Sequence, residues 1–124
     1  SSKANKALFV KINEESIMAG LSCGEASAFA WDIIAEEASD FVTIPENVVA
    51  PTVRLLAKSQ SNDPVIEAGE SAVAGLAALI CAAKQPSLRA TLGLNESSRV
   101  LLFGSEGVTD QAIFDEIMTG DTYG

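Results

Sequence analysis

Apolar and polar positions follow one another in blocks along the chain, and these blocks predict strands and helices in alternation. Four short runs of strand-forming residues are each followed by a longer segment with helical spacing, in three cases after a polar turn. The predicted strands cover residues 7–12, 40–44, 65–68 and 99–103. Alternation of this kind is typical of an α/β fold, with a mostly parallel sheet and helices on both of its faces.

The helix boundaries are predicted from capping residues and prolines. Ser22 and Glu25 have the spacing of a capping box, so a helix should follow them. Pro45 suits the first turn of a second helix, whereas Pro51 should kink that helix or delay its start. Thr109 is expected to cap a last helix. The first helix has an apolar face at helical spacing, made by Ala26, Phe29, Ala30, Ile33 and Ile34.

The most apolar segment, residues 72–83, predicts a fully buried helix, since it is apolar nearly all round. Gly75 lowers its helix propensity and indicates close packing at that position. The segment is too short to cross a bilayer, which takes about 20 residues. No linker or internal repeat divides the 124 residues, so we expect one domain over residues 1–124.

Charge and rare residue types restrict the possible functions. The net charge of −9 argues against nucleic acid and anionic membranes as partners, because their phosphates would be repelled. The absence of histidine excludes a Ser-His-Asp or Cys-His catalytic unit within the chain and disfavours a zinc site. The two cysteines, Cys23 and Cys81, do not form a disulfide framework, which favours a cytoplasmic location.

Three polar turns that contain glycine are the candidate ligand site. They cover residues 20–25, 69–71 and 104–107. If the predicted strands are parallel, all three turns lie at one sheet edge, where α/β proteins bind ligands. The alternative is that they are ordinary connections, with Glu70 facing water and Ser105 bonded only to its own turn.

Taken together, four segments resemble the diaminopropionate ammonia-lyase family. They are IMAGLSCGEAS (17–27), FVTIPENVVAPTVRLLA (41–57), DPVIEAGESAVAGLAAL (63–79) and LGLNESSRVLLFGSEGVTD (92–110). Each motif alone is weak, but the four stand in the family's order and spacing. The resemblance implies a partial fold-type II pyridoxal-phosphate enzyme, similar to the tryptophan synthase β subunit in fold. It further implies elimination of ammonia from 2,3-diaminopropionate to give pyruvate, with the cofactor as electron sink.

The resemblance also implies which residues contact the cofactor, pyridoxal 5′-phosphate. Gly20 and Leu21 match a loop that lines one face of its ring, and Glu70 and Ser71 match a turn beside the ring. Ser105 matches the hydroxyl residue that faces the pyridine nitrogen, where relatives commonly have threonine. These residues should therefore surround one hollow of about the size of the ring. No catalytic residue and no metal ligand is implied for this chain.

The chain differs from the family in two ways that limit its expected activity in isolation. In the family the Schiff-base lysine and the glycine-rich phosphate loop lie upstream of the matching region, and no lysine here stands in such a motif. We therefore expect the carboxyl-terminal part of a larger lyase, inactive in isolation. The implied partners are a small amino-acid substrate and a second copy, as a homodimer or a self-associating fragment. Two alternatives remain open: a threonine or serine dehydratase of the same fold, and a non-catalytic interaction or regulatory module.

Overall fold

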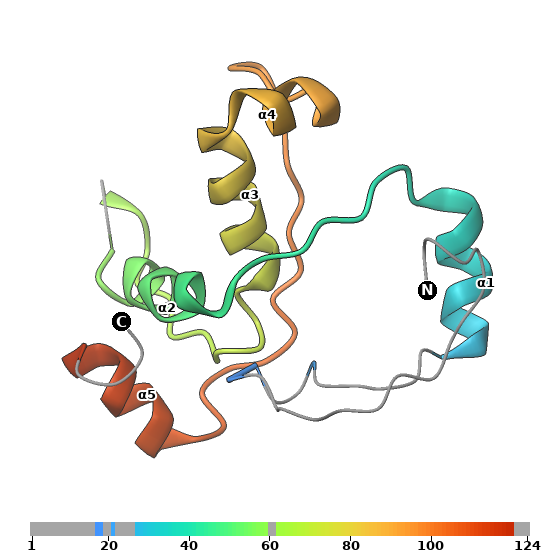
Figure 1. The fold of residues 1–124 in the computed structure, drawn as a ribbon. Coiled ribbons are helices and arrows are strands. Elements are labelled where there is room, and N and C mark those ends of the chain that lie inside the picture. The colour runs from blue at the N-terminus through green and yellow to red at the C-terminus, as the bar shows by residue number, and fades with distance from the viewer. Residues whose placement is uncertain (1–16, 19–20, 22–26, 60–61, 121–124) are drawn as a thin grey trace. The chain divides into compact units, whose positions relative to one another are not determined.

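The computed structural model describes residues 17–18, 21, 27–59 and 62–120, and Figure 1 shows its course. The chain separates into two compact units, residues 1–42 and residues 43–124. The first unit contains α1 (Ala28–Glu37). The second contains a short 3-10 helix, η3 (Glu46–Val48), and four α-helices: α2 (Val49–Ala57), α3 (Ala74–Lys84), α4 (Pro86–Leu92) and α5 (Gln111–Thr119).

The predicted sheet is wrong for the part of the chain that the structure describes. Residues 40–44, 65–68 and 99–103 run extended without forming a strand, and the described secondary structure is helical. A single antiparallel bridge joins Ala68 to Gly107. The predicted strand at residues 7–12 lies outside the described residues. The physical reason is that apolar, β-branched sequence favours an extended backbone, but a strand also needs a neighbour that takes up its hydrogen bonds.

In the first unit, α1 forms where a helix is expected but buries none of its residues. Its cap is Ser27, whose hydroxyl oxygen accepts from the Ala30 N–H at 3.3 Å. The predicted capping box of Ser22 and Glu25 falls outside the described residues. The predicted apolar face is open, with Phe29 78% exposed. The rings of Trp31 and Phe41 lie 6.2 Å apart, which gives this unit a small aromatic contact.

In the second unit, α2 packs against α3 and α5, and the core lies between these helices. The most deeply buried residues of this core are Val49, Ala50, Val53, Val73, Ala77 and Ile117. Burial of a valine or isoleucine side chain stabilises a fold by roughly 1.5–3 kcal/mol. The small core is therefore made by helix–helix contacts.

Local sequence explains where these helices begin. Pro51 is the third residue of α2, within the first turn, where a missing N–H costs little; the delayed start predicted from this proline is confirmed. The predicted cap of the last helix is one residue off, since Asp110 and not Thr109 caps α5. The Asp110 carboxylate accepts from the Ile113 N–H at 3.1 Å.

The apolar helix predicted from residues 72–83 is α3, although only Ala77 and Ala82 are fully buried in it. Gly75 is exposed, and a Cβ there would lie 3.4 Å from Leu102 Cδ2, an ordinary van der Waals distance, so the close packing predicted at this position does not require glycine. In Figure 1 the extended segment after α4 runs back along α3 towards α5. None of the described helices is both long and apolar enough to cross a membrane.

Candidate functional site

Two of the three predicted turns meet in the structure. The first is the predicted turn 69–71, taken here together with Ala68, and the second is residues 104–107. We call residues 68–71 and 104–107 the paired turns. Ala68 and Gly107 form the antiparallel bridge, and the Gly69 N–H donates to the Glu106 carbonyl at 3.3 Å. The turns are thus held by backbone contact. The expected reason for their meeting, parallel strand ends at one sheet edge, is wrong.

Gly69 is the residue that lets the two turns come together. A Cβ at this position would lie 2.3 Å from the Gly107 carbonyl oxygen and 2.8 Å from Glu106 Oε1. Distances of that size are steric clashes, so any larger residue would push the turns apart. Gly107 lies opposite and has open space where its own Cβ would be. The close approach of the two turns therefore requires glycine at position 69 but not at position 107.

Glu70 and Ser71 are buried, with 7% and 6% of their surfaces exposed. The turn that holds them closes when the Ala72 N–H donates to the Gly69 carbonyl at 3.1 Å, and α3 begins two residues later. Most of the Glu70 side chain therefore packs against the fold.

The other predicted cofactor contacts are Ser105, Leu21 and Gly20, and they do not all belong to the paired turns. Ser105 lies in the second of the paired turns, and its side chain is exposed. Leu21 is 51% exposed and belongs to the first unit, where its N–H donates to the Met18 carbonyl at 2.8 Å. Gly20 lies outside the described residues. The structure thus brings the turns of Glu70, Ser71 and Ser105 together, while the roles of Gly20 and Leu21 remain predictions.

A hollow of about 310 Å³ lies beside the paired turns. It is lined by Ala68, Gly104 and Glu106 of these turns and by apolar side chains that include Ile66, Val73 and Leu102. Glu70, Ser71 and Ser105 do not line it. The sequence analysis did not single out Glu106, although its position in the same turn as Ser105 could have drawn attention to it.

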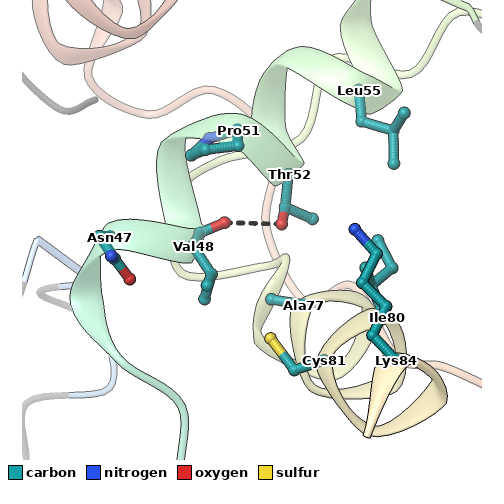
Figure 2. Close-up of a pocket in the computed structure, with 9 residues that line it drawn as sticks. All are labelled: Asn47, Val48, Pro51, Thr52, Leu55, Ala77, Ile80, Cys81 and Lys84. Carbon is teal, nitrogen blue, oxygen red and sulfur yellow. Dashed lines mark hydrogen bonds between the residues drawn. The ribbon is translucent and has the colours of Figure 1, made fainter.

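A second hollow, the α2–α3 groove, has a volume of about 450 Å³ and is shown in Figure 2. Pro51, Leu55, Ala77 and Cys81 contribute to its walls. The Thr52 hydroxyl donates to the Val48 carbonyl at 2.7 Å, so it is already bonded within α2. The groove suits an apolar group and offers no acid–base pair. Sequence analysis missed it, although Val48, Thr52 and Leu55 recur at helical spacing, as do Ala77 and Cys81.

Arg54 of α2 is a further residue that sequence analysis missed. Its Nε and Nη2 atoms are buried and have no hydrogen-bond partner among the described residues. Arginine stays charged in proteins, and its donors are costly to bury without an acceptor. Arg54 therefore has two donors for an acceptor that the described residues do not supply.

The described residues do not by themselves fit pyridoxal 5′-phosphate. Covalent attachment needs a lysine, and both described lysines are exposed, Lys58 after the end of α2 and Lys84 at the end of α3 away from the paired turns. The paired turns provide a hydroxyl at Ser105 but contain no glycine-rich loop at a helix N-terminus that would hold a phosphate.

Comparison of the sequence with known proteins finds relatives of one kind, and no family model matches it. Diaminopropionate ammonia-lyase of Escherichia coli (strain K12) is 37% identical over 105 residues. The enzyme of Salmonella typhimurium is 33% identical over 106 residues. Each alignment covers 82% of this chain and 26% of the relative.

Solved structures of the E. coli diaminopropionate ammonia-lyase are similar to the chain in fold. The complex with an aminoacrylate–PLP azomethine reaction intermediate matches 87% of this chain with a TM-score of 0.80 and 35% identity. The complex with D-serine matches 89% with a TM-score of 0.79 and 34% identity. In both cases the match covers 29% of the solved chain. The chain is therefore homologous to diaminopropionate ammonia-lyase over most of its own length, and it spans about a quarter of the curated relatives that it matches.

Proposed function

We propose that this chain is one part of a pyridoxal-phosphate-dependent ammonia-lyase that eliminates ammonia from 2,3-diaminopropionate to give pyruvate. The observation that carries the proposal is the meeting of the paired turns within the homologous region, through the Gly69–Glu106 hydrogen bond. In this proposal Glu70, Ser71 and Ser105 form one wall of the cofactor site. The Schiff-base lysine, the phosphate anchor and the bases belong to the remainder of the enzyme.

The burial of Glu70 and Ser71 supports this role, because polar side chains held in a fixed geometry are suited to orient a ligand. The exposure of Ser105 is consistent with a hydroxyl that meets a group outside this chain. The relatives found support an ammonia-lyase over a threonine or serine dehydratase. A small amino-acid substrate and a homodimer are part of the same proposal.

A chimera tests the proposal. The matching region of the E. coli enzyme is replaced by this chain, and pyruvate release from 2,3-diaminopropionate is measured. We expect the chimera to be active and the isolated chain to be inactive. Ser105→Ala in the chimera should weaken cofactor binding, followed by absorbance during titration, while Ser87→Ala on the exposed surface of α4 should leave it unchanged.

Two results would contradict the proposal. One is a folded chimera that releases no pyruvate from 2,3-diaminopropionate. The other is a chimera that acts faster on threonine or serine, since that result would favour the dehydratase alternative. Glu70→Gln keeps the shape of the buried side chain and removes its charge, so its effect on KM and kcat separates a charge requirement from a packing one.

A further inference from the structure

A third hollow, of about 380 Å³, lies between α3, α4 and the residues that follow α4, and we call it the α4 hollow. Leu79 of α3 and Val100 contribute to its apolar walls, and its polar side chains are Arg89, Asn95 and Ser98. None of the residues that line it belongs to the paired turns. A hollow of this volume with a few polar groups among apolar walls suits a small ligand.

The end of α4 explains why these polar side chains come together. Gly93 ends the helix in the left-handed conformation, with φ 68°, and the Leu94 N–H donates to the Arg89 carbonyl at 2.9 Å. This is a common way for a helix to end, and it turns the chain back on itself. Asn95 and Ser98 therefore line the same hollow as the side chain of Arg89.

The three polar side chains present hydrogen-bond donors. Asn95 Oδ1 already accepts from the Ser97 N–H at 2.8 Å, and Ser98 Oγ accepts from the Asn95 N–H at 2.9 Å. The Asn95 amide NH₂ and the Ser98 hydroxyl hydrogen have no acceptor among the described residues, and the Arg89 guanidinium forms neither a hydrogen bond nor an ion pair there. Arginine can only donate. No carboxylate of the described residues lines the hollow.

Charge favours the same kind of ligand. The stretch that contains the hollow's polar residues carries Lys84, Arg89 and Arg99 against one acid, Glu96, although the whole chain has a net charge of −9. A positive region attracts small anions, and a guanidinium binds both oxygens of one carboxylate at once. An ammonium group would meet only donors in this hollow and would be repelled. The hollow therefore favours a carboxylate that carries no amino group.

We propose that the α4 hollow binds a 2-oxo carboxylate, in which a keto group lies next to the carboxylate on a short carbon chain. The carboxylate meets Arg89, the keto oxygen accepts from Asn95 or Ser98, and the carbon chain lies against Leu79 and Val100. The three donor side chains thus find acceptor oxygens in one small molecule. The site does not rest on the proposed function, which enters only as one source of such a compound, pyruvate.

The test is a titration of the isolated chain with pyruvate, followed by NMR at the Asn95 and Ser98 amides and at the Arg89 Nε–H. We expect saturable shifts with a dissociation constant on the order of millimolar, because the ligand is small. Arg89→Gln should weaken binding by about tenfold or more, because the charge-assisted hydrogen bonds are lost. Arg99→Gln removes the same charge from an exposed residue that does not line the hollow, so it should keep the affinity.

Two analogues test the class of ligand. L-Alanine has an ammonium group in place of the keto oxygen, and propionate has a methylene group there, so each should bind about fivefold more weakly than pyruvate or worse. Equal binding of propionate or of inorganic phosphate would overturn the assignment to a 2-oxo carboxylate.

Two further results would overturn the site itself. One is the absence of any saturable shift with pyruvate. The other is an equal loss of affinity in Arg89→Gln and Arg99→Gln, because general charge attraction would then account for the binding. The measurement needs no lyase activity, so a chimera that releases no pyruvate would contradict the proposed function alone.

Discussion

The helical core around α2 and α5 and the extended segment at residues 99–103 are both apolar, but they reach different states. Val53 and Ile117 in the core are at most 1% exposed, whereas Leu101 and Phe103 are about four-fifths exposed. A helix satisfies most of its backbone hydrogen bonds internally, so two helices need only pack side chains together. An extended segment depends on a neighbour for the same bonds. Among the described residues, the helices around the core therefore satisfy most of their backbone hydrogen bonds themselves, while residues 99–103 do not.

The largest expected effect comes from a substitution in the helical core. Ile117→Ala removes a fully buried side chain of α5 and should lower the free energy of unfolding by about 2–5 kcal/mol. Urea denaturation of the isolated chain, followed by circular dichroism, measures it. Leu101→Ala is the matched control, an apolar truncation at an exposed site, and should change stability by about 0.5 kcal/mol or less. Equal losses of unfolding free energy in the two variants would contradict the difference in burial between the helical core and residues 99–103.

The next effect concerns the paired turns. One of them, residues 104–107, follows the extended segment at residues 99–103 and precedes α5. Gly69→Ala places a Cβ 2.3 Å from the Gly107 carbonyl oxygen, so the turns must separate, at a cost of about 1–3 kcal/mol. Urea denaturation reports the loss, and faster hydrogen exchange of the Gly69 amide reports the broken bond to Glu106. Gly107→Ala is the control, because open space surrounds that position. If Gly69→Ala leaves both measurements unchanged, the turns do not meet as described.

Sequence reasoning was successful for the helices because their information is local. The apolar helix at residues 72–83 and the delayed start of α2 at Pro51 were both predicted from residues within a few positions of each other. The sheet could not be predicted in this way. Residues 99–103 have the composition of a buried strand, but composition does not reveal whether a pairing neighbour is present.

Prediction of the candidate site from sequence was limited in the same way, because local patterns do not reveal contacts between distant positions. The two glycine-containing turns were singled out from their own residues, and their meeting is confirmed. The way they meet depends on contact between positions far apart in sequence, Gly69 and Glu106, which no local pattern encodes. The α2–α3 groove was missed for a related reason: it needs two helix faces to be matched to each other, and each face alone resembles ordinary core.

A smaller effect tests which residue caps the start of α5. Asp110→Ala should destabilise the second unit by about 1 kcal/mol, because the carboxylate no longer accepts from the Ile113 N–H. Thr109→Ala, at the position predicted from sequence, should have almost no effect. The two variants are compared by urea denaturation under identical conditions. A larger loss for Thr109→Ala would restore the sequence-based boundary and contradict the observed one.

The smallest expected effect is in α1, a helix that forms without burying any of its residues. Ser27→Ala removes the oxygen that accepts from the Ala30 N–H, at a local cost of about 0.5 kcal/mol. Because α1 contributes no buried side chain, its loss should speed hydrogen exchange in its first turn by about twofold without moving the urea midpoint. Ser27→Asp keeps an acceptor and adds a charge favourable at a helix N-terminus, so it should retain the protection. A lower urea midpoint for Ser27→Ala would mean that α1 unfolds together with the core, and exposure would then be a poor guide to which parts of this chain depend on each other.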